Sequence, residues 1–135
     1  MVEECIFCRI ARNEAPASLV CDDDEVIAFL DARPVNEGHT LVITRKHYVN
    51  IYEAPDEEVA HLFQIVKKVA TAVKESEKAD GISVFQNNGR AANQVVFHLH
   101  VHIIPRHEGQ SSQRNREIVE QSRLDEVAAR IREFI

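Results

Sequence analysis

The chain has 135 residues, of which 44% are hydrophobic and 28% are charged, a composition close to that of ordinary globular domains. That length suits one hydrophobic core, so we expect residues 1–135 to form a single domain. The formal net charge of -6 argues against nucleic acid as a partner, because phosphate-backbone binding depends on clustered Lys and Arg. No apolar run approaches the roughly 18 residues of a membrane span, and the start is acidic where a secretory signal is basic. We therefore expect a cytoplasmic protein without a membrane partner.

The hydrophobic pattern predicts an α+β domain without internal repeats. After a short helix near the start, residues 18–21 and 25–30 are strand-like runs around the acidic turn 22–24, which is typical of a hairpin. Residues 40–44 are a β-branched run of strand length, and we expect them to form a central strand.

The best helix prediction covers residues 55–78, where apolar side chains recur at intervals of three and four. A proline followed by three acidic residues marks its first turn, and an Asp-Gly pair marks its end. A short strand is expected at 82–86 and a final amphipathic helix at 124–135. The polar residues 108–121 before that helix predict a mobile surface connection.

Three histidines alternate with apolar residues in the segment 95–105. In a strand, this spacing places His98, His100 and His102 on one face, about 6.5 to 7 Å apart, and turns the intervening apolar residues toward the core. Such a row is compatible with a solvent-exposed face, with a metal site, or with nucleophilic catalysis by an imidazole that is largely neutral at cellular pH. The regular alternation disfavours the first reading, and the other two can coexist.

Residues 94–106 resemble the signature of the histidine triad (HIT) superfamily, in which three histidines alternate with apolar residues. Other segments match the family in the same order, namely 5–10, 28–31, 38–43 and 87–89. The resemblance covers about residues 4–107 and leaves 108–135 as a C-terminal extension with a helix. It is strongest to the small Hint-like and bacterial HIT proteins. That branch implies an antiparallel sheet of about five strands, one long helix, short terminal helices and a homodimer.

The resemblance also implies a role for each histidine. His100 would attack the α-phosphate of a bound nucleoside phosphate, giving a nucleotidyl-histidine that water hydrolyses. His98 would orient His100 through a backbone carbonyl, while His102 and His39 would lie beside the phosphoryl oxygens. From its spacing alone, His39 is equally compatible with a cap at the start of a strand.

A nucleotide pocket is implied by the same resemblance, for an adenosine or guanosine 5'-phosphate derivative. Asp31 would accept hydrogen bonds from the ribose hydroxyls. The base would lie among apolar side chains that are equally compatible with ordinary core, namely Ile6, Phe7, Ile10, Phe29 and Leu30. Asn87 matches a position near the leaving group, although it also suits a turn. Gln94 lies in a segment whose backbone amides would bind phosphate.

Cys5 and Cys8 form a Cys-x-x-Cys pair, which is compatible with a redox pair, half of a zinc site, or no role. A thioredoxin-like redox role requires a βαβ context that the pattern lacks. Some bacterial HIT proteins bind structural zinc through this pair and two histidines. The resemblance therefore implies a closed tetrahedral Zn²⁺ site made by Cys5, Cys8, His47 and His98, with no cofactor needed for the chemistry itself.

Together these inferences favour a hydrolase of nucleoside 5'-phosphoramidates or related nucleotidyl phosphoanhydrides. One departure from the Hint-like pattern is Val95, which stands where a serine usually reaches the phosphoryl or leaving-group atoms. A dinucleoside polyphosphate hydrolase is therefore one alternative. A nucleotide-sensing module without turnover is another.

Overall fold

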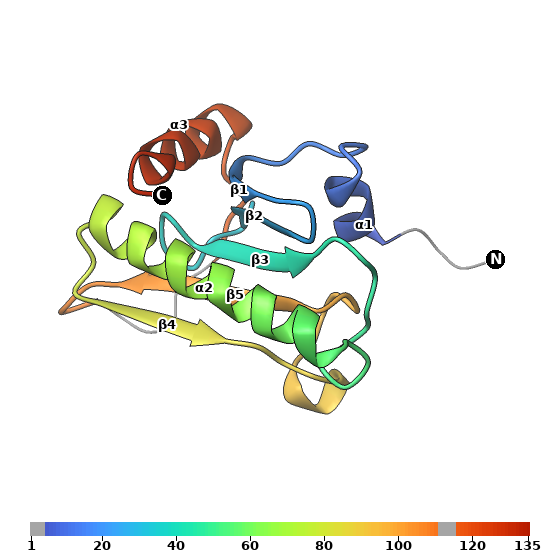
Figure 1. Ribbon diagram of the computed structural model, residues 1–135. Helices are drawn as coiled ribbons and strands as arrows, with labels where there is room; N and C mark the ends of the chain where they lie inside the picture. The colour runs from blue at the N-terminus through green and yellow to red at the C-terminus, as the bar shows by residue number, and fades with distance from the viewer. Residues whose placement is uncertain (1–4, 111–115) are drawn as a thin grey trace.

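A computed structural model of the chain describes residues 5–110 and 116–135 (Figure 1). The elements follow in the order α1 (Ile6–Ala11), β1 (Leu19–Asp22), β2 (Val26–Leu30), β3 (Thr40–Thr44), α2 (Asp56–Ser76), β4 (Gly81–Phe85), the 3-10 helix η1 (Arg90–Ala92), β5 (His100–Arg106) and α3 (Gln121–Arg132). Five strands form one antiparallel sheet in the order β1-β2-β3-β5-β4, which confirms the predicted α+β class. Within the described ranges, no helix is both long and apolar enough to cross a membrane.

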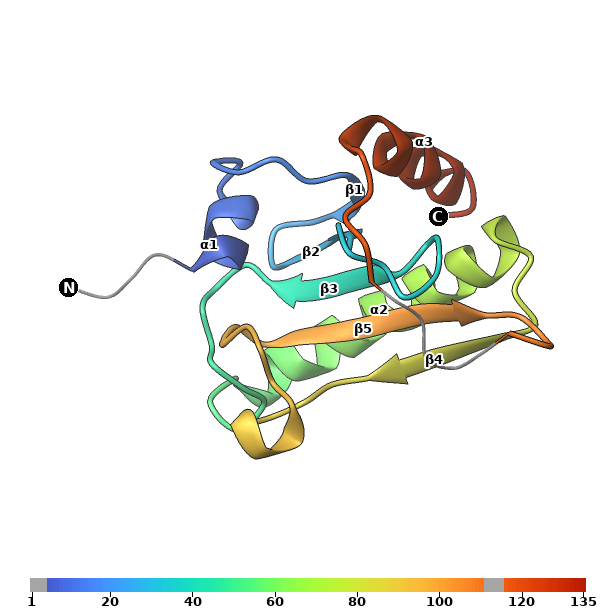
Figure 2. The ribbon, with the colours of Figure 1, turned by 180° about the vertical axis from the view of Figure 1, so that it is seen from behind.

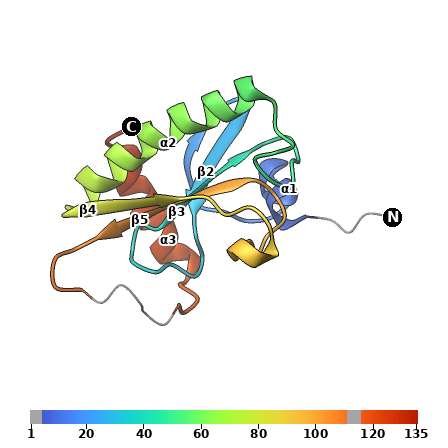
Figure 3. The same cartoon turned by 90° about the horizontal axis from the view of Figure 1, so that it is seen from below.

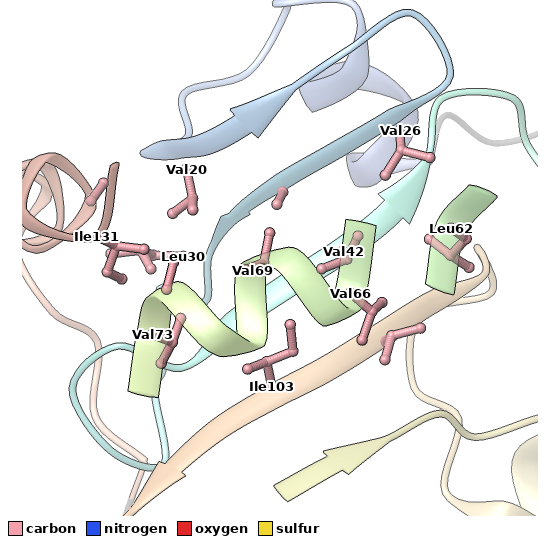
Figure 4. Close-up of a cluster of buried hydrophobic side chains, with 14 of the residues drawn as sticks. Val20, Val26, Leu30, Val42, Leu62, Val66, Val69, Val73, Ile103 and Ile131 are labelled. Atoms are coloured by element: carbon pink, nitrogen blue, oxygen red, sulfur yellow. The ribbon is translucent and has the colours of Figure 1, made fainter. Parts of the chain in front are cut away.

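Helix α2 lies across one face of the sheet, which Figure 3 shows edge-on. Its ends agree closely with the predicted 55–78: Pro55 precedes the acidic first turn, and the helix stops before Lys78, whose φ of 52° is left-handed. The stripe that α2 buries against the sheet consists of Leu62, Val66, Val69, Ala72 and Val73 (Figure 4). Helix α3 adds to the same core with Leu124, Val127, Ala128 and Ile131.

The opposite face of the sheet is partly covered by the short helix α1 (Figure 2). Alternate residues of a strand point to opposite faces, so Ile27 and Phe29 of β2 pack with α1 while their neighbours pack with α2. Phe7 of α1 meets Phe29 edge to face, with ring centroids 5.5 Å apart. This smaller cluster also holds Ile43 of β3, the ladder partner of His100.

The histidine segment is less regular than predicted, because β5 begins at His100 rather than at Val95. Ahead of the strand, Asn93 has a left-handed φ of 69° at the end of η1. The backbone N–H of Leu99 then donates to the carbonyl of Tyr48 at 2.7 Å, outside the sheet. His98 therefore precedes the strand, and only the last two histidines of the row belong to it.

The C-terminal extension also differs from its prediction. Helix α3 begins at Gln121, earlier than expected, and of the connection 108–121 the residues 111–115 lie outside the described part. Immediately before α3, the backbone N–H of Val119 donates to the carbonyl of Ala32 at 2.9 Å. The residues that lead into α3 are thus hydrogen-bonded to the loop after β2, and mobility of the connection stays a prediction.

Candidate active site and metal centre

The two strand histidines lie on the face of the sheet that carries α1. His100 is paired with Ile43 and His102 with Leu41, and both partners belong to the cluster around α1. Facing the other way, toward α2, are the fully buried Leu99, Val101 and Ile103. The predicted separation of imidazoles from core residues therefore holds within β5.

His100 has a tautomer that its contacts define. Its Nδ1 lies 2.6 Å from the carbonyl oxygen of His98, and since a carbonyl only accepts, Nδ1 carries the proton. The lone pair is then on Nε2. Burial lowers the pKa of His100, so the ring is neutral near pH 7. A neutral imidazole with a lone pair on Nε2 is the form that can attack phosphorus.

His102 has its tautomer set by a chain of two hydrogen bonds. The backbone N–H of Val35 donates to Nδ1 of His39 at 3.0 Å, which places the His39 proton on Nε2. That Nε2–H lies 3.0 Å from Nδ1 of His102 and donates to it. His102 therefore carries its own proton on Nε2. Burial lowers the pKa of His102 to about 4, and a neutral His102 offers this N–H as a hydrogen-bond donor.

His39 is a buried neighbour of His102. Its ring is 1% exposed, and burial lowers its pKa to about 2, with His102 also disfavouring a charge. Both of its nitrogens are engaged, one by Val35 and one by His102. His39 therefore contacts the histidine row through the ring of His102, and a place for His39 beside the phosphoryl oxygens stays a prediction.

A possible metal site at Asp31, His39 and His102 is disfavoured by the same hydrogen bonds. Their potential ligand atoms lie within 4.8 Å of one another. However, Nδ1 of His39 already accepts from Val35, so Nε2 could bind a cation only if the ring lost its last proton. A hydrogen-bonded relay accounts for this group of residues better than a metal does.

Asp31 follows β2 and is largely buried, with its side chain 14% exposed. Burial raises the pKa of this carboxyl, whereas the backbone N–H of Arg33 and the charge of Arg116 act in the opposite sense. Oδ1 accepts from Arg33 N at 2.9 Å, and Oδ2 accepts from Arg116 Nη2 at 2.7 Å. Oδ2 also lies 3.6 Å from Nε2 of His39, so Asp31 borders the histidine row.

The apolar residues expected around the base do not all share one surface. Phe7, Ile10 and Phe29 form the buried cluster beside the histidines, and the Phe7 ring lies edge-on to His100 with centroids 5.1 Å apart. Ile6 is 44% exposed beside them. Leu30 is the exception, because strand alternation sends its side chain to the opposite face, into the core with α2.

The loop between β4 and β5 contains three further residues of interest. Gln94 is 3% exposed, and its amide accepts from Gly89 N at 2.7 Å and donates to the carbonyl of Val49 at 2.6 Å. Its side chain thus holds the loop together, and binding of phosphate by the backbone amides of this segment stays a prediction. Asn87 is half-buried two residues after the end of β4, and Val95 is 83% exposed.

Cys5, Cys8, His47 and His98 converge into one cluster, with their potential ligand atoms within 4.8 Å of one another. Nδ1 of His98 lies 3.4 Å from Cys5 Sγ and 3.5 Å from Cys8 Sγ, and Cys8 Sγ lies 3.2 Å from Nδ1 of His47. Tetrahedral bonds of about 2.3 Å to sulfur and 2.0 Å to nitrogen require such ligand–ligand distances of about 3.5 Å. Nε2 of His98 donates to the carbonyl of Thr44 at 2.7 Å, which leaves Nδ1 free to bind a metal. The cluster fits a Zn²⁺ ion.

Three neighbours of the histidine row were not predicted from the sequence. Phe85 of β4 stacks on His102, with ring centroids 4.5 Å apart and 13° between the planes. Val35 sets the His39 tautomer through a backbone group, which any residue except proline could provide. Arg116 reaches Asp31 across 85 positions of the chain. Pairing of β4 with β5 is the one signal that could have placed Phe85 opposite His102.

Comparison with known proteins agrees with this geometry. The HIT domain family matches residues 12–109. The chain belongs to this family. An uncharacterized HIT-like protein of Methanocaldococcus jannaschii is 44% identical over 128 residues, covering 95% of this chain and 98% of that protein. The adenosine 5'-monophosphoramidase of Candida albicans is 37% identical over 106 residues, covering 76% of this chain and 70% of that protein.

Solved structures of this HIT family have the same fold. A Hit-like protein of Bartonella henselae, described with an unknown ligand, has a TM-score of 0.92 and 44% identity, covering 97% of this chain and 96% of that one. A zinc-bound histidine triad family protein of Mycobacterium smegmatis has a TM-score of 0.86 and 35% identity, covering 96% and 91%.

Proposed function

We propose that this HIT-family chain is a nucleotide-binding hydrolase that cleaves nucleoside 5'-phosphoramidates or related nucleotidyl phosphoanhydrides through a nucleotidyl-His100 intermediate. The observation that carries the proposal is the hydrogen bond from Nδ1 of His100 to the His98 carbonyl, which leaves the Nε2 lone pair available. The name of the Candida relative, an adenosine 5'-monophosphoramidase, supports an adenosine 5'-phosphate derivative as substrate, and a guanosine 5'-phosphate derivative is the alternative.

The reaction takes place in two displacements at the α-phosphorus. In the first, Nε2 of His100 forms a bond to phosphorus, the bond from phosphorus to the leaving amine breaks, and the amine takes a proton from water. In the second, water attacks phosphorus and gives its proton to the hydroxide left by the first step, the bond to Nε2 breaks, and the nucleoside monophosphate leaves with His100 neutral again. The Nε2–H of His102 stabilises charge on the phosphoryl oxygens in both steps.

We propose that Asp31 binds the ribose hydroxyls and that Phe7, Ile10 and Phe29, with the exposed Ile6, form the wall against which the base packs. Asn87, after β4, is assigned to the leaving-group side of the phosphate. The side chains of Leu30 and Gln94 have no part in this proposal because each is buried in other contacts.

We further propose that Cys5, Cys8, His47 and His98 hold a structural Zn²⁺ ion. When bound, the ion ties the start of α1 to the segment before β5. His98 then belongs to both centres, since its ring faces the cysteines and its carbonyl holds His100. In this proposal the cluster stabilises the fold and positions His98, and it takes no part in proton or phosphoryl transfer.

A homodimer is proposed from the exposed edge of the sheet. Strand β4 is the edge next to β5 (Figure 1), and it exposes Val84 by 45% and Phe85 by 39%. Phe63 on the neighbouring helix α2 is 38% exposed. Edge pairing of two copies would cover these apolar groups and unpaired backbone. Light scattering after gel filtration tests this, and a monomer at micromolar concentration would overturn it.

A dinucleoside polyphosphate hydrolase is the second candidate, and Val95 is the observation that favours it. The side chain has no hydroxyl to offer a departing amine and is 83% exposed. Turnover should be compared on adenosine 5'-phosphoramidate and on diadenosine tetraphosphate, with Val95→Ser as the matched variant. We expect higher kcat/KM on the phosphoramidate, and a severalfold gain there in V95S. Preference for the tetraphosphate would select the second candidate, and no turnover of either would select a binding module.

A further inference from the structure

Arg116, in the C-terminal extension, contacts the carboxylate to which the proposed function assigns the ribose. Its Nη2 lies 2.7 Å from Oδ2 of Asp31, and its Nε donates to the carbonyl of Arg33 at 2.6 Å. The guanidinium thus bridges a side chain and a backbone carbonyl of the loop after β2. Figure 2 shows the segment that leads into α3 passing beside this loop.

The position of Arg116 is fixed by contacts of the residues that follow it in the chain. Val119 N donates to the carbonyl of Ala32, one residue after Asp31. Helix α3, which follows, is buried through Leu124 and Ile131, and its Asp125 accepts from Ser18 Oγ at 2.7 Å. Arg116 therefore approaches Asp31 from a segment that is held in place, although its own side chain is 43% exposed.

The Asp31 carboxylate keeps hydrogen-bond acceptor positions that Arg116 does not use. An ionised carboxylate has about four acceptor positions, two on each oxygen. Oδ1 uses one for Arg33 N, and Oδ2 uses one for Arg116. His39 Nε2 is too far from Oδ2, at 3.6 Å, for a good hydrogen bond. One position on each oxygen remains, which matches the two hydroxyl donors of a ribose cis-diol.

We infer that Arg116 is a positioning residue that holds the Asp31 carboxylate oriented and ionised for a ribose diol, and so sets the selectivity for ribonucleotides. The inference rests on the proposed role of Asp31. A carboxylate that is 14% exposed needs a cation or donors to remain ionised, and Arg116 is its one ion-pair partner among Lys and Arg in the described residues. The hydrogen bond from Arg116 also fixes the orientation of the Asp31 carboxylate, and so determines which of its lone pairs point away from the protein.

The test compares binding of AMP and 2',3'-dideoxy-AMP by calorimetry, which requires no turnover. The proteins are wild type, Arg116→Gln, Arg116→Lys and Asp31→Asn, with Arg123→Gln as matched control because Arg123 lies on the same extension and pairs with Glu37 instead of Asp31. We expect wild type to bind AMP at least about 100 times more tightly than the dideoxy compound, as for two hydrogen bonds to a charged acceptor. R116Q should lose most of that ratio, R116K should keep part of it, and R123Q should keep all of it. Dideoxy-AMP should bind wild type and R116Q alike.

Each other outcome overturns a defined part of the account. If D31N loses the ratio and R116Q keeps it, Asp31 binds the ribose without Arg116 and the inference fails alone. If R116Q weakens both ligands equally, Arg116 acts on the phosphate. If R116Q binds AMP more tightly than wild type does, the contact between Arg116 and Asp31 inhibits nucleotide binding and the inference fails. If wild type does not distinguish the two ligands, the proposed ribose role of Asp31 fails as well.

Discussion

His98 connects the metal centre to the nucleophile His100 through two different atoms. Its ring Nδ1 faces Cys5 and Cys8, at 3.4 Å and 3.5 Å, while its backbone carbonyl accepts the Nδ1–H of His100 at 2.6 Å. Loss of the contacts that hold the His98 ring would therefore loosen the residue whose carbonyl orients the nucleophile. The stability of the fold and the geometry of the catalytic imidazole share one residue.

The first prediction concerns Cys8→Ser. We expect this variant to lose Zn²⁺ from about one ion per chain, to unfold roughly 10 °C lower, and to react more slowly because His98 is no longer held. Elemental analysis and thermal denaturation measure the first two effects. Cys21→Ser is the control, since Cys21 lies on β1 outside the cluster. Full zinc content in C8S would contradict the assigned ligand set.

The second prediction separates two substitutions of His39. His39→Ala removes the donor to Nδ1 of His102 and should lower kcat by about tenfold to a hundredfold with little change in KM. His39→Gln keeps an amide N–H that can reach His102, so its loss should be clearly smaller. Equal losses in the two variants would show that the hydrogen bond to His102 is not what His39 provides.

The third prediction is a dependence of stability on pH. Burial lowers the pKa of His39 to about 2 and that of His102 to about 4, below the 6.5 of an unfolded histidine. The unfolded chain therefore binds more protons in acid. The stabilising contribution is complete above pH 6.5 and is lost as the pH falls through 6.5 toward these folded values. The slope approaches about 1.4 kcal/mol per pH unit for each histidine.

Urea titrations of wild type and His39→Gln at about pH 7.5 and about pH 5 measure this dependence. Both proteins keep the same cysteines and His98, so acid release of zinc affects them equally. As the pH is lowered, the free energy of unfolding should fall less steeply in H39Q than in wild type. Parallel curves for the two proteins would mean that His39 is not held neutral by burial.

The fourth prediction concerns Phe85, whose ring stacks on His102. Phe85→Leu removes an aromatic contact worth about 0.5 to 1.5 kcal/mol, so His102 should be less well held and kcat should fall about 2- to 10-fold. Phe134→Leu, at an exposed position near the C-terminus, is the control. Gel filtration of both variants separates this effect from a change in assembly. Unchanged kcat in F85L with unchanged assembly would rule out a positioning role.

Local patterns in the sequence predicted much of the fold. The alternation around His100 placed two imidazoles opposite a buried apolar row, and the three- and four-residue spacing of 55–78 marked α2 closely. The Cys-x-x-Cys pair and two distant histidines were assembled by family resemblance, and the structure brings all four together. These features depend on short-range periodicity or on a shared motif, which a single sequence carries.

The features that were missed depend on contacts between distant segments. His98 leaves the strand because Leu99 pairs with the backbone of Tyr48, and no local propensity indicates that bond. The pairing of Asp31 with Arg116 spans 85 positions of the chain, an interval that contains β3, β4 and β5. Leu30 was grouped with Phe29 although adjacent strand residues face opposite ways, an error that the period of two could have prevented.

The most direct test of the central claim is the mass of the protein after brief reaction with adenosine 5'-phosphoramidate and an alkaline quench, since a phosphorus–nitrogen bond to histidine survives alkali. Wild type should gain one adenylyl group, and peptide mapping should place it on His100. His100→Ala, which leaves His98 and His102 in place, should gain none. An adenylyl group that persists in H100A, or that maps to another histidine in wild type, would contradict the account.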